Sequence, residues 1–183
     1  MPTRKAIIGF IACLWGMAAA MLPLWGQLSS YGLGRSPTAG EIAAWDLSIG
    51  PEGKELPPGE GTALAGREVF SLRCSECHGT EGQGADKGDA LVGGQGSLTR
   101  PRPAKTIGSY WPYATTIWDY VNRAMPFDRP GTLTRDQVYS VVAYLLYLNG
   151  IIGEEDVMNA ATLPEVHMPN REAFVPDPRP DVD

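Results

Sequence analysis

The sequence is poor in cysteine and histidine, with three cysteines and two histidines in 183 residues. Cys13 lies inside an apolar N-terminal run, so Cys74 and Cys77 form the only cysteine pair in the remaining chain. A single pair, three positions apart, excludes the disulfide framework that stabilises many small secreted domains. These two cysteines are therefore available for other chemistry.

Positive charge is also scarce. The 15 lysines and arginines are outnumbered by 21 aspartates and glutamates, and the formal net charge is −6. This balance argues against nucleic acid as a partner, because nucleic-acid-binding domains carry basic patches. The acidity is concentrated in residues 151–183, which contain eight acidic and two basic residues.

Glycine and proline, in contrast, are abundant, with 22 glycines and 16 prolines. Their share is well above the roughly 12% that is usual in proteins. Residues 79–96 alone contain seven glycines and show no helical pattern. A long loop inside a compact domain is typical of a functional segment or of one that wraps a ligand. We therefore expect a loop-rich domain with a modest core, in which a buried cofactor supplies apolar surface.

The N-terminus has the pattern of a secretory signal. Arg4 and Lys5 precede an uncharged apolar run over residues 6–26, and Ala18–Ala20 offers the small residues of a cleavage site. The run is also close to the ~20 residues that span a bilayer as a helix. Two interpretations stay open, a cleaved signal peptide or an uncleaved inner-membrane anchor. Both predict that the main domain lies in the periplasm.

The remaining chain divides into three further regions, and the pattern of all of them is helical or irregular. We found no strand-rich stretch and no internal repeat, which predicts an all-α fold. Thr38 and Glu41 have the spacing of a helix capping box, whereas residues 51–61 are typical of a linker. The predicted regions are 1–28, signal peptide or membrane anchor; 29–61, irregular extension and linker; 62–150, folded domain; 151–183, acidic proline-rich extension.

Three main helices are expected in the folded domain. The first begins near Thr62 and ends at the cysteine pair, with Leu64, Val69 and Leu72 at near-helical spacing. The second runs from about Thr115 to Met125, where Pro126 ends it. Four of its residues are expected on one apolar face: Ile117, Tyr120, Val121 and Ala124.

The third helix has the clearest signals. Thr134 and Gln137 form a capping box, and Asn149 with Gly150 provides a C-terminal stop. Between them, five apolar residues recur at helical spacing and predict a buried face: Val138, Val141, Val142, Leu145 and Leu148.

The cysteine pair and the histidine after it carry the chemistry. Cys74, Cys77 and His78 form a C-x-x-C-H motif, the attachment signature of haem c. One helical turn separates the two thiols, so both can bond the vinyl groups at one edge of a porphyrin, and His78 follows as an iron ligand. A thioredoxin-like site would need a βαβ pattern, and a zinc site would need a second ligand pair. Neither pattern is visible, so we predict one covalent haem c.

A sixth iron ligand in such a protein is methionine or histidine. Met125 is the main candidate, because Pro126 ends its helix and can turn the thioether toward the iron. The glycine-rich loop between His78 and Met125 is long enough to pass round the haem edge. Met168, which also precedes a proline, and then His167 are the alternatives that stay open.

A short basic segment follows the glycine-rich loop. Arg100, Arg102 and Lys105 lie within six residues of one another and precede Tyr110 and Trp111. We predict that one or more of these cations bind the haem propionates. A solvated basic loop is an almost equally good interpretation.

The three-helix frame around the C-x-x-C-H motif resembles a class I cytochrome c. Gly66 and Phe70 match the glycine and aromatic positions of that family's first helix, and Tyr144 and Leu145 match its last helix. The resemblance implies an all-α fold in which three main helices surround one haem c. It further implies that Gly66 allows a close crossing of the two helices and that Phe70 packs on Tyr144.

A narrower resemblance covers most of the chain after the N-terminal run. It is similar to the SoxD-like cytochrome subunit of periplasmic sulfite and sulfane dehydrogenases. The matching segments are Tyr31–Arg35, Glu41–Asp46, Gly108–Ala114, Trp118–Pro126 and Met168–Arg171. The resemblance implies a partner subunit that carries a molybdenum cofactor and oxidises sulfite or sulfane sulfur. It also implies that Met125 is the axial methionine. Some members have two haem domains, whereas this chain has one C-x-x-C-H motif and matches a mono-haem form.

Three functions are therefore considered. In the first, the chain is an electron-transfer subunit that passes single electrons to an acceptor cytochrome or oxidase and does no substrate chemistry itself. In the second, the protein is an independent electron carrier of a respiratory or photosynthetic chain, and residues 6–26 anchor it to the membrane. In the third, the protein is a haem enzyme or gas sensor with an open sixth position on the iron.

Overall fold

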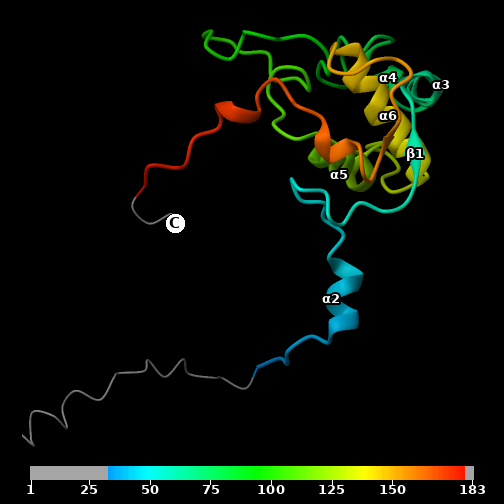
Figure 1. Ribbon diagram of the computed structural model, residues 1–183, viewed down its shortest axis with the longest axis vertical. Helices are drawn as coiled ribbons and strands as arrows, with labels where there is room; N and C mark the ends of the chain where they lie inside the picture. Colours follow the sequence, from blue (N-terminus) through cyan, green and yellow to red (C-terminus); the bar gives the residue numbers. More distant parts are fainter. Residues whose placement is uncertain (1–32, 180–183) are drawn as a thin grey trace, which may run out of the picture. The chain divides into compact units, whose positions relative to one another are not determined.

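The structure, a computed structural model, describes residues 33–179. It is dominated by helices, as Figure 1 shows, and confirms the predicted all-α class. The predicted signal or anchor, residues 6–26, lies outside the described residues. Within residues 33–179, no helix has the length and apolarity needed to cross a bilayer. The elements are α2 (Ala39–Trp45), β1 (Glu60–Gly61), α3 (Ala63–Arg73), α4 (Ser75–His78), α5 (Ala114–Ala124), α6 (Arg135–Leu148), β2 (Met158–Asn159), η1 (Leu163–Glu165) and η2 (Arg171–Ala173).

Helix α2 begins at the predicted capping box. The Glu41 backbone N–H donates to Thr38 Oγ1 at 3.3 Å, and the Thr38 backbone N–H donates to Glu41 Oε2 at 2.8 Å. Arg35 also pairs with Glu41 at 2.5 Å. None of the residues of α2 is buried, so these local bonds support the helix without a core.

Helices α3 and α6 cross at the predicted glycine. A Cβ atom at Gly66 would lie 1.9 Å from the carbonyl oxygen of Ser140, so only glycine permits this approach. Beside the crossing, the rings of Phe70 and Tyr144 pack with their centroids 5.4 Å apart. Both contacts confirm what the resemblance to class I cytochromes c implied.

Helix α3 confirms the predicted first helix, which begins near Thr62 and ends at the cysteine pair. Its buried side is not the side of its leucines. Leu64 and Leu72 are 61% and 73% exposed, whereas Ala63, Gly66 and Phe70 are buried. The reason is the close helix crossing, which selects the side of α3 with small residues. The large apolar residues Leu64 and Leu72 lie on a different side of the helix.

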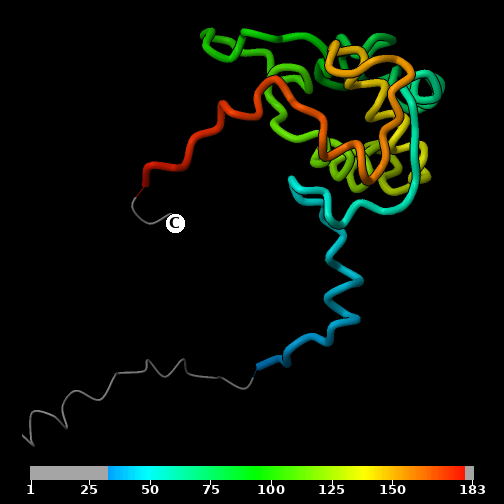
Figure 2. Tube along the Cα trace, in the orientation of Figure 1, coloured from blue at the N-terminus to red at the C-terminus, as the bar shows by residue number. Residues whose placement is uncertain are grey.

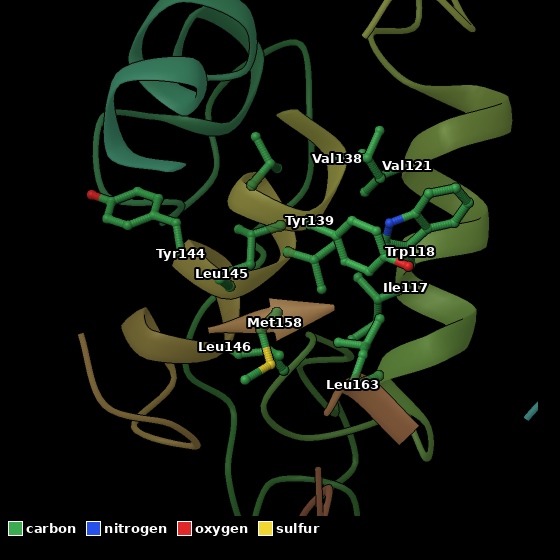
Figure 3. Packing of buried hydrophobic residues seen from close by; sticks show 14 of the residues in the cluster. Ile117, Trp118, Val121, Val138, Tyr139, Tyr144, Leu145, Leu146, Met158 and Leu163 are labelled. Atoms are coloured by element: carbon green, nitrogen blue, oxygen red, sulfur yellow. The ribbon is translucent and has the colours of Figure 1, made fainter. Parts of the chain in front are cut away.

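Helix α5 confirms the predicted second helix within one residue at each end. Its predicted face is correct for Ile117 and Val121 but wrong for Tyr120, which is 47% exposed. Trp118 takes the buried position instead and packs on Tyr139 of α6, with ring centroids 5.4 Å apart. Figure 3 shows Ile117 and Trp118 of α5 facing the side chains of α6 across this core.

Helix α6 is the centre of the core. The Gln137 backbone N–H donates to Thr134 Oγ1 at 3.3 Å, and the Thr134 N–H donates to Gln137 Oε1 at 2.9 Å, which confirms the capping box. Every residue from 138 to 146 is buried. The helix ends at Asn149, and Gly150 follows with a φ of 69°, as the predicted stop requires.

The segment predicted as a linker packs on this core. Leu56 is buried, and the Tyr139 hydroxyl donates to the carbonyl oxygen of Pro57 at 2.8 Å. Glu60 and Gly61 then form β1, which pairs antiparallel with β2. Proline and glycine in this segment therefore form turns of the folded unit, and the sequence pattern did not distinguish these from a free linker.

The C-terminal extension also covers the domain itself through most of its described length. Met158, Leu163, Val166 and Met168 are all buried in the same cluster as the helices. Figure 2 shows this segment, orange to red, returning along the helices after α6. Residues 175–179, in contrast, are exposed.

Candidate haem site

The cysteine motif occupies the corner between α3 and α4. Cys74 ends α3 and begins α4, and the backbone N–H groups of Cys77 and His78 both donate to the Cys74 carbonyl oxygen, at 3.1 and 3.0 Å. This single turn carries both thiols, which are free and partly buried. Burial, and to a smaller extent the neighbouring Cys77, raises the pKa of Cys74 to about 11. The Cys74 thiol therefore lies against an apolar wall.

The imidazole of His78 is oriented by the glycine-rich loop. His78 Nδ1 lies 2.8 Å from the carbonyl oxygen of Asp89. A carbonyl can only accept, so we assign the proton to Nδ1, which leaves the Nε2 lone pair free for a metal. A Cβ atom at Gly88 would lie 3.1 Å from the ring atoms Cε1 and Nδ1 of His78. The loop thus passes directly over the imidazole.

Backbone hydrogen bonds hold this loop in shape. The Gly84 N–H donates to the His78 carbonyl oxygen at 2.8 Å, and the Leu91 N–H donates to the Gly82 carbonyl oxygen at 2.7 Å. The loop folds back on itself and returns to the histidine. This confirms the prediction of a long irregular segment next to the motif.

Asn149 fastens the far end of the same loop to α6. Its Oδ1 accepts from the Gly93 N–H at 3.1 Å, while its Nδ2 donates to the carbonyl oxygens of Leu91 and Leu145 at 3.2 and 2.8 Å. The sequence indicated Asn149 only as part of a helix stop. Nothing in the local pattern pointed to contacts with residues more than 50 positions away.

Met125 lies where α5 ends. Its backbone N–H still donates to Val121 at 3.1 Å, but its ψ of 150° leaves the helix. The side chain is partly buried and packs at the edge of the core. Three residues later, Asp128 is close enough to Glu76 of α4 to affect the pKa of Glu76, although the bond from Lys87 lowers that pKa more strongly.

The two alternative ligands lie in different surroundings. Met168 has no exposed surface, because protein atoms enclose it on all sides. A sulfur ligand needs an accessible side, and Met125 is partly exposed whereas Met168 is not. His167 is exposed, although its neighbours Val166 and Met168 are buried.

The donor set fits haem c. Two thiols on one turn, an imidazole with a free Nε2 and a thioether are the groups that hold this cofactor in proteins. Within residues 33–179, no cluster of three or more histidine, cysteine, aspartate or glutamate side chains could hold a metal ion.

The basic segment lies on the surface. Arg100, Arg102 and Lys105 are exposed, and none takes part in an ion pair among the described residues. Lys105 Nζ instead lies 5.1 Å from the ring centroid of Tyr110. Propionate binding by these cations stays a prediction.

Comparisons with known proteins identify the family of this domain. The family model described as cytochrome c matches residues 63–149. A chain in the crystal structure of the sulfane dehydrogenase SoxCD from Paracoccus pantotrophus is 46% identical, with a TM-score of 0.74. The match covers 81% of this chain and 73% of that chain. No curated protein matches the sequence.

Proposed function

The chain belongs to the cytochrome c family, and from this premise we propose that it is the electron-accepting subunit of a molybdenum-dependent sulfite or sulfane dehydrogenase. The observation that carries the proposal is the extent of the similarity to a chain of SoxCD. It spans 81% of this sequence at 46% identity, well beyond the family domain of residues 63–149. The regions on either side of the family domain are therefore largely included in the match.

We assign one covalent haem c to the C-x-x-C-H turn, in agreement with the cofactor of the family. Cys74 and Cys77 would provide the two thioether links, and His78 would ligate the iron through Nε2. The bond from His78 Nδ1 to the Asp89 carbonyl fixes the ring orientation that this role requires. Met125 is proposed as the sixth ligand, because its partly exposed side chain lies where α5 ends.

The haem, once bound, supplies a one-electron couple at the iron. The chain's own residues hold this group rigidly, with two covalent links from one turn and a histidine positioned by the loop. A thioether ligand favours a higher reduction potential than a second imidazole would. An iron with six ligands has no open position for a substrate, so the subunit moves electrons and the partner does the sulfur chemistry.

The partner and the compartment are parts of the same proposal. The similar structure is that of a sulfane dehydrogenase, SoxCD. By analogy, this chain would act in the periplasm, accept electrons from a molybdenum-cofactor subunit and deliver them to an acceptor cytochrome or oxidase.

The direct test is to co-express the matured cytochrome with the molybdenum oxidoreductase of the same organism. Purification through a tag on the cytochrome is expected to recover both subunits. Adding sulfite or a sulfane donor to the oxidised complex should reduce the haem, as recorded by its visible spectrum. The cytochrome alone should show no such reduction. If the two subunits do not co-purify and the haem is not reduced, the proposal is rejected.

A further inference from the structure

An open pocket of about 530 Å³ lies on the domain, away from the proposed haem ligands. Its walls come from residues 95–99 and from residues 169–174, and residues 108–110 form its floor. None of Cys74, Cys77, His78 or Met125 lines it. We call residues 168–174 the C-terminal strap and residues 100–105 the basic loop.

The strap is held firmly against the floor of the pocket. Asn170 Nδ2 donates to the carbonyl oxygen of Tyr110 at 2.8 Å. The Phe174 ring meets the Tyr110 ring edge to face, with centroids 5.5 Å apart, and the Arg171 guanidinium lies 4.9 Å from the Tyr113 ring centroid. The pocket is therefore a built feature with two walls joined by specific contacts.

The lining of the pocket is uncharged. Leu98, Tyr110, Pro169 and Phe174 contribute apolar surface, while Ser109 and other neutral polar groups face the same space. A small free anion would find no cation inside it. The lining suits an apolar or aromatic side chain with hydrogen-bonding backbone groups beside it.

The chain segments that flank the lining residues, which we call the rim, are in contrast strongly basic. The described residues include thirteen lysines and arginines, of which seven form ion pairs. Of the six others, three lie in the basic loop and a fourth, Arg171, lies on the strap. No acidic residue occurs from position 90 to 118, although the chain as a whole carries −6. The strap itself has one carboxylate, the exposed Glu172.

We propose that this pocket receives an extended, acidic segment of a partner polypeptide. An apolar side chain of the segment would enter the pocket, and neighbouring carboxylates would meet Arg100, Arg102 and Lys105. That the partner is the molybdenum-cofactor subunit rests on the function proposed above. Charge complementarity selects the occupant. Four cations without ionic partners lie in the segments that flank an uncharged pocket, and they favour an anionic chain with an apolar anchor.

The two parts of the surface contribute differently to binding. The apolar anchor is buried and mainly sets the dissociation rate, whereas exposed rim charges raise the association rate and make binding depend on salt. Substitutions of the rim should therefore change the salt dependence of affinity. A substitution that fills the pocket should weaken binding and leave the salt dependence unchanged.

The experiment measures binding of the holo-cytochrome to the purified molybdenum subunit at low and high salt. The triple variant R100E/R102E/K105E is expected to lose about ten-fold in affinity at low salt and to show a weaker salt dependence. Ala173→Trp, at the pocket wall, should weaken binding at both salt concentrations. Arg135→Glu and Ala65→Trp, at exposed positions outside the pocket, are matched controls and should bind like the parent protein.

Each outcome separates this inference from the proposed function. If the parent protein binds and the pocket variants bind equally well, the pocket assignment is overturned while the proposed function stands. A changed midpoint potential in the triple variant with unchanged affinity would assign the basic loop to the haem propionates and also overturn it.

If the parent protein does not bind that subunit, a peptide tests the pocket independently. Acetyl-Glu-Glu-Phe-Glu-Glu-amide should shift the NMR signals of Leu98, Tyr110 and Phe174 in the holo-cytochrome. The matching peptide with lysine in place of glutamate should not. Equal shifts with both peptides, or none at these three residues, would overturn the inference.

Discussion

At the scale of single residues, the proposed role of Met125 as an iron ligand rests on its place at the end of α5 and on its partly exposed side chain. Replacing Met125 with alanine is expected to remove the sulfur ligand of the iron. The reduced variant should then bind carbon monoxide rapidly, whereas the parent protein should not, as visible spectra would record. Met168→Leu is the matched control, since its fully enclosed side chain should cost less than about 1.5 kcal/mol and leave carbon monoxide binding unchanged. Rapid carbon monoxide binding by the Met168→Leu variant, without such binding by the Met125→Ala variant, would assign the ligand to Met168 instead.

Gly66 tests the helix crossing in the same way. An alanine Cβ there would lie 1.9 Å from a backbone oxygen of Ser140, which cannot move without separating α3 from α6. Gly66→Ala should therefore lower the free energy of unfolding by about 3 kcal/mol or more, as denaturant titration would measure. Gly40→Ala, where nothing lies within 4 Å, is the control and should not destabilise the protein. Equal midpoints for the two variants would contradict the close crossing.

The residues of the site differ in how visible they are in the sequence. Cys74, Cys77 and His78 follow from spacing alone, because the motif is contiguous and its chemistry fixes the order of the residues. The contributions of Asp89 and Asn149 could not be predicted. Asp89 acts through its backbone carbonyl, which every residue has, and Asn149 acts on residues that only the fold brings near.

At the scale of elements, the loop over His78 depends on its attachment to α6. Asn149→Ala would remove three hydrogen bonds and leave the Gly93 N–H without its partner. We expect a loss of about 1–3 kcal/mol in the free energy of unfolding. The ring of His78 should also gain mobility, visible as changed NMR signals of that residue and a shifted midpoint potential. A destabilised variant with unchanged histidine signals would show that Asn149 supports the fold but does not position the ligand.

Helix α2 is expected to respond to acid. The bond from Arg35, followed by two bonds from Thr38, lowers the pKa of Glu41 to about 2. Because the folded pKa lies below the ordinary value of 4.5, the support from Glu41 is present above pH 4.5 and is lost as the pH falls through about 2. NMR titration of Glu41 measures its pKa, and Glu41→Gln should remove the pH dependence of the stability of α2. A midpoint near 4.5 would contradict the capping geometry.

Element starts and ends were easier to predict than the faces of the helices. Capping boxes at Thr38 and Thr134 and the stop at Gly150 are local in sequence, and the structure contains all three. Tyr120 was expected on the buried face of its helix and is exposed. Which side of a helix is buried depends on its partner, and a close crossing favours glycine and alanine over larger apolar residues.

At the scale of the whole molecule, most of the C-terminal extension belongs to the packed unit. Deleting residues 157–183 would remove four buried apolar side chains, Met158, Leu163, Val166 and Met168. At about 2 kcal/mol each, the loss is comparable with the roughly 5–15 kcal/mol that stabilise a typical domain, so the truncated protein should unfold at ambient temperature. Deleting residues 175–183 should leave the melting temperature nearly unchanged, because residues 175–179 are exposed. Circular dichroism melts distinguish the two, and a stable longer deletion would contradict this packing.

The central claim is that one haem is linked to both cysteines of the turn that ends in His78. The most direct measurement is mass spectrometry of the matured protein and of its peptide that contains residues 74–78. The account predicts one added haem per chain, retained on that peptide after extraction with acidified acetone. A peptide with two unmodified cysteines, from protein produced with working haem-attachment machinery, would contradict it.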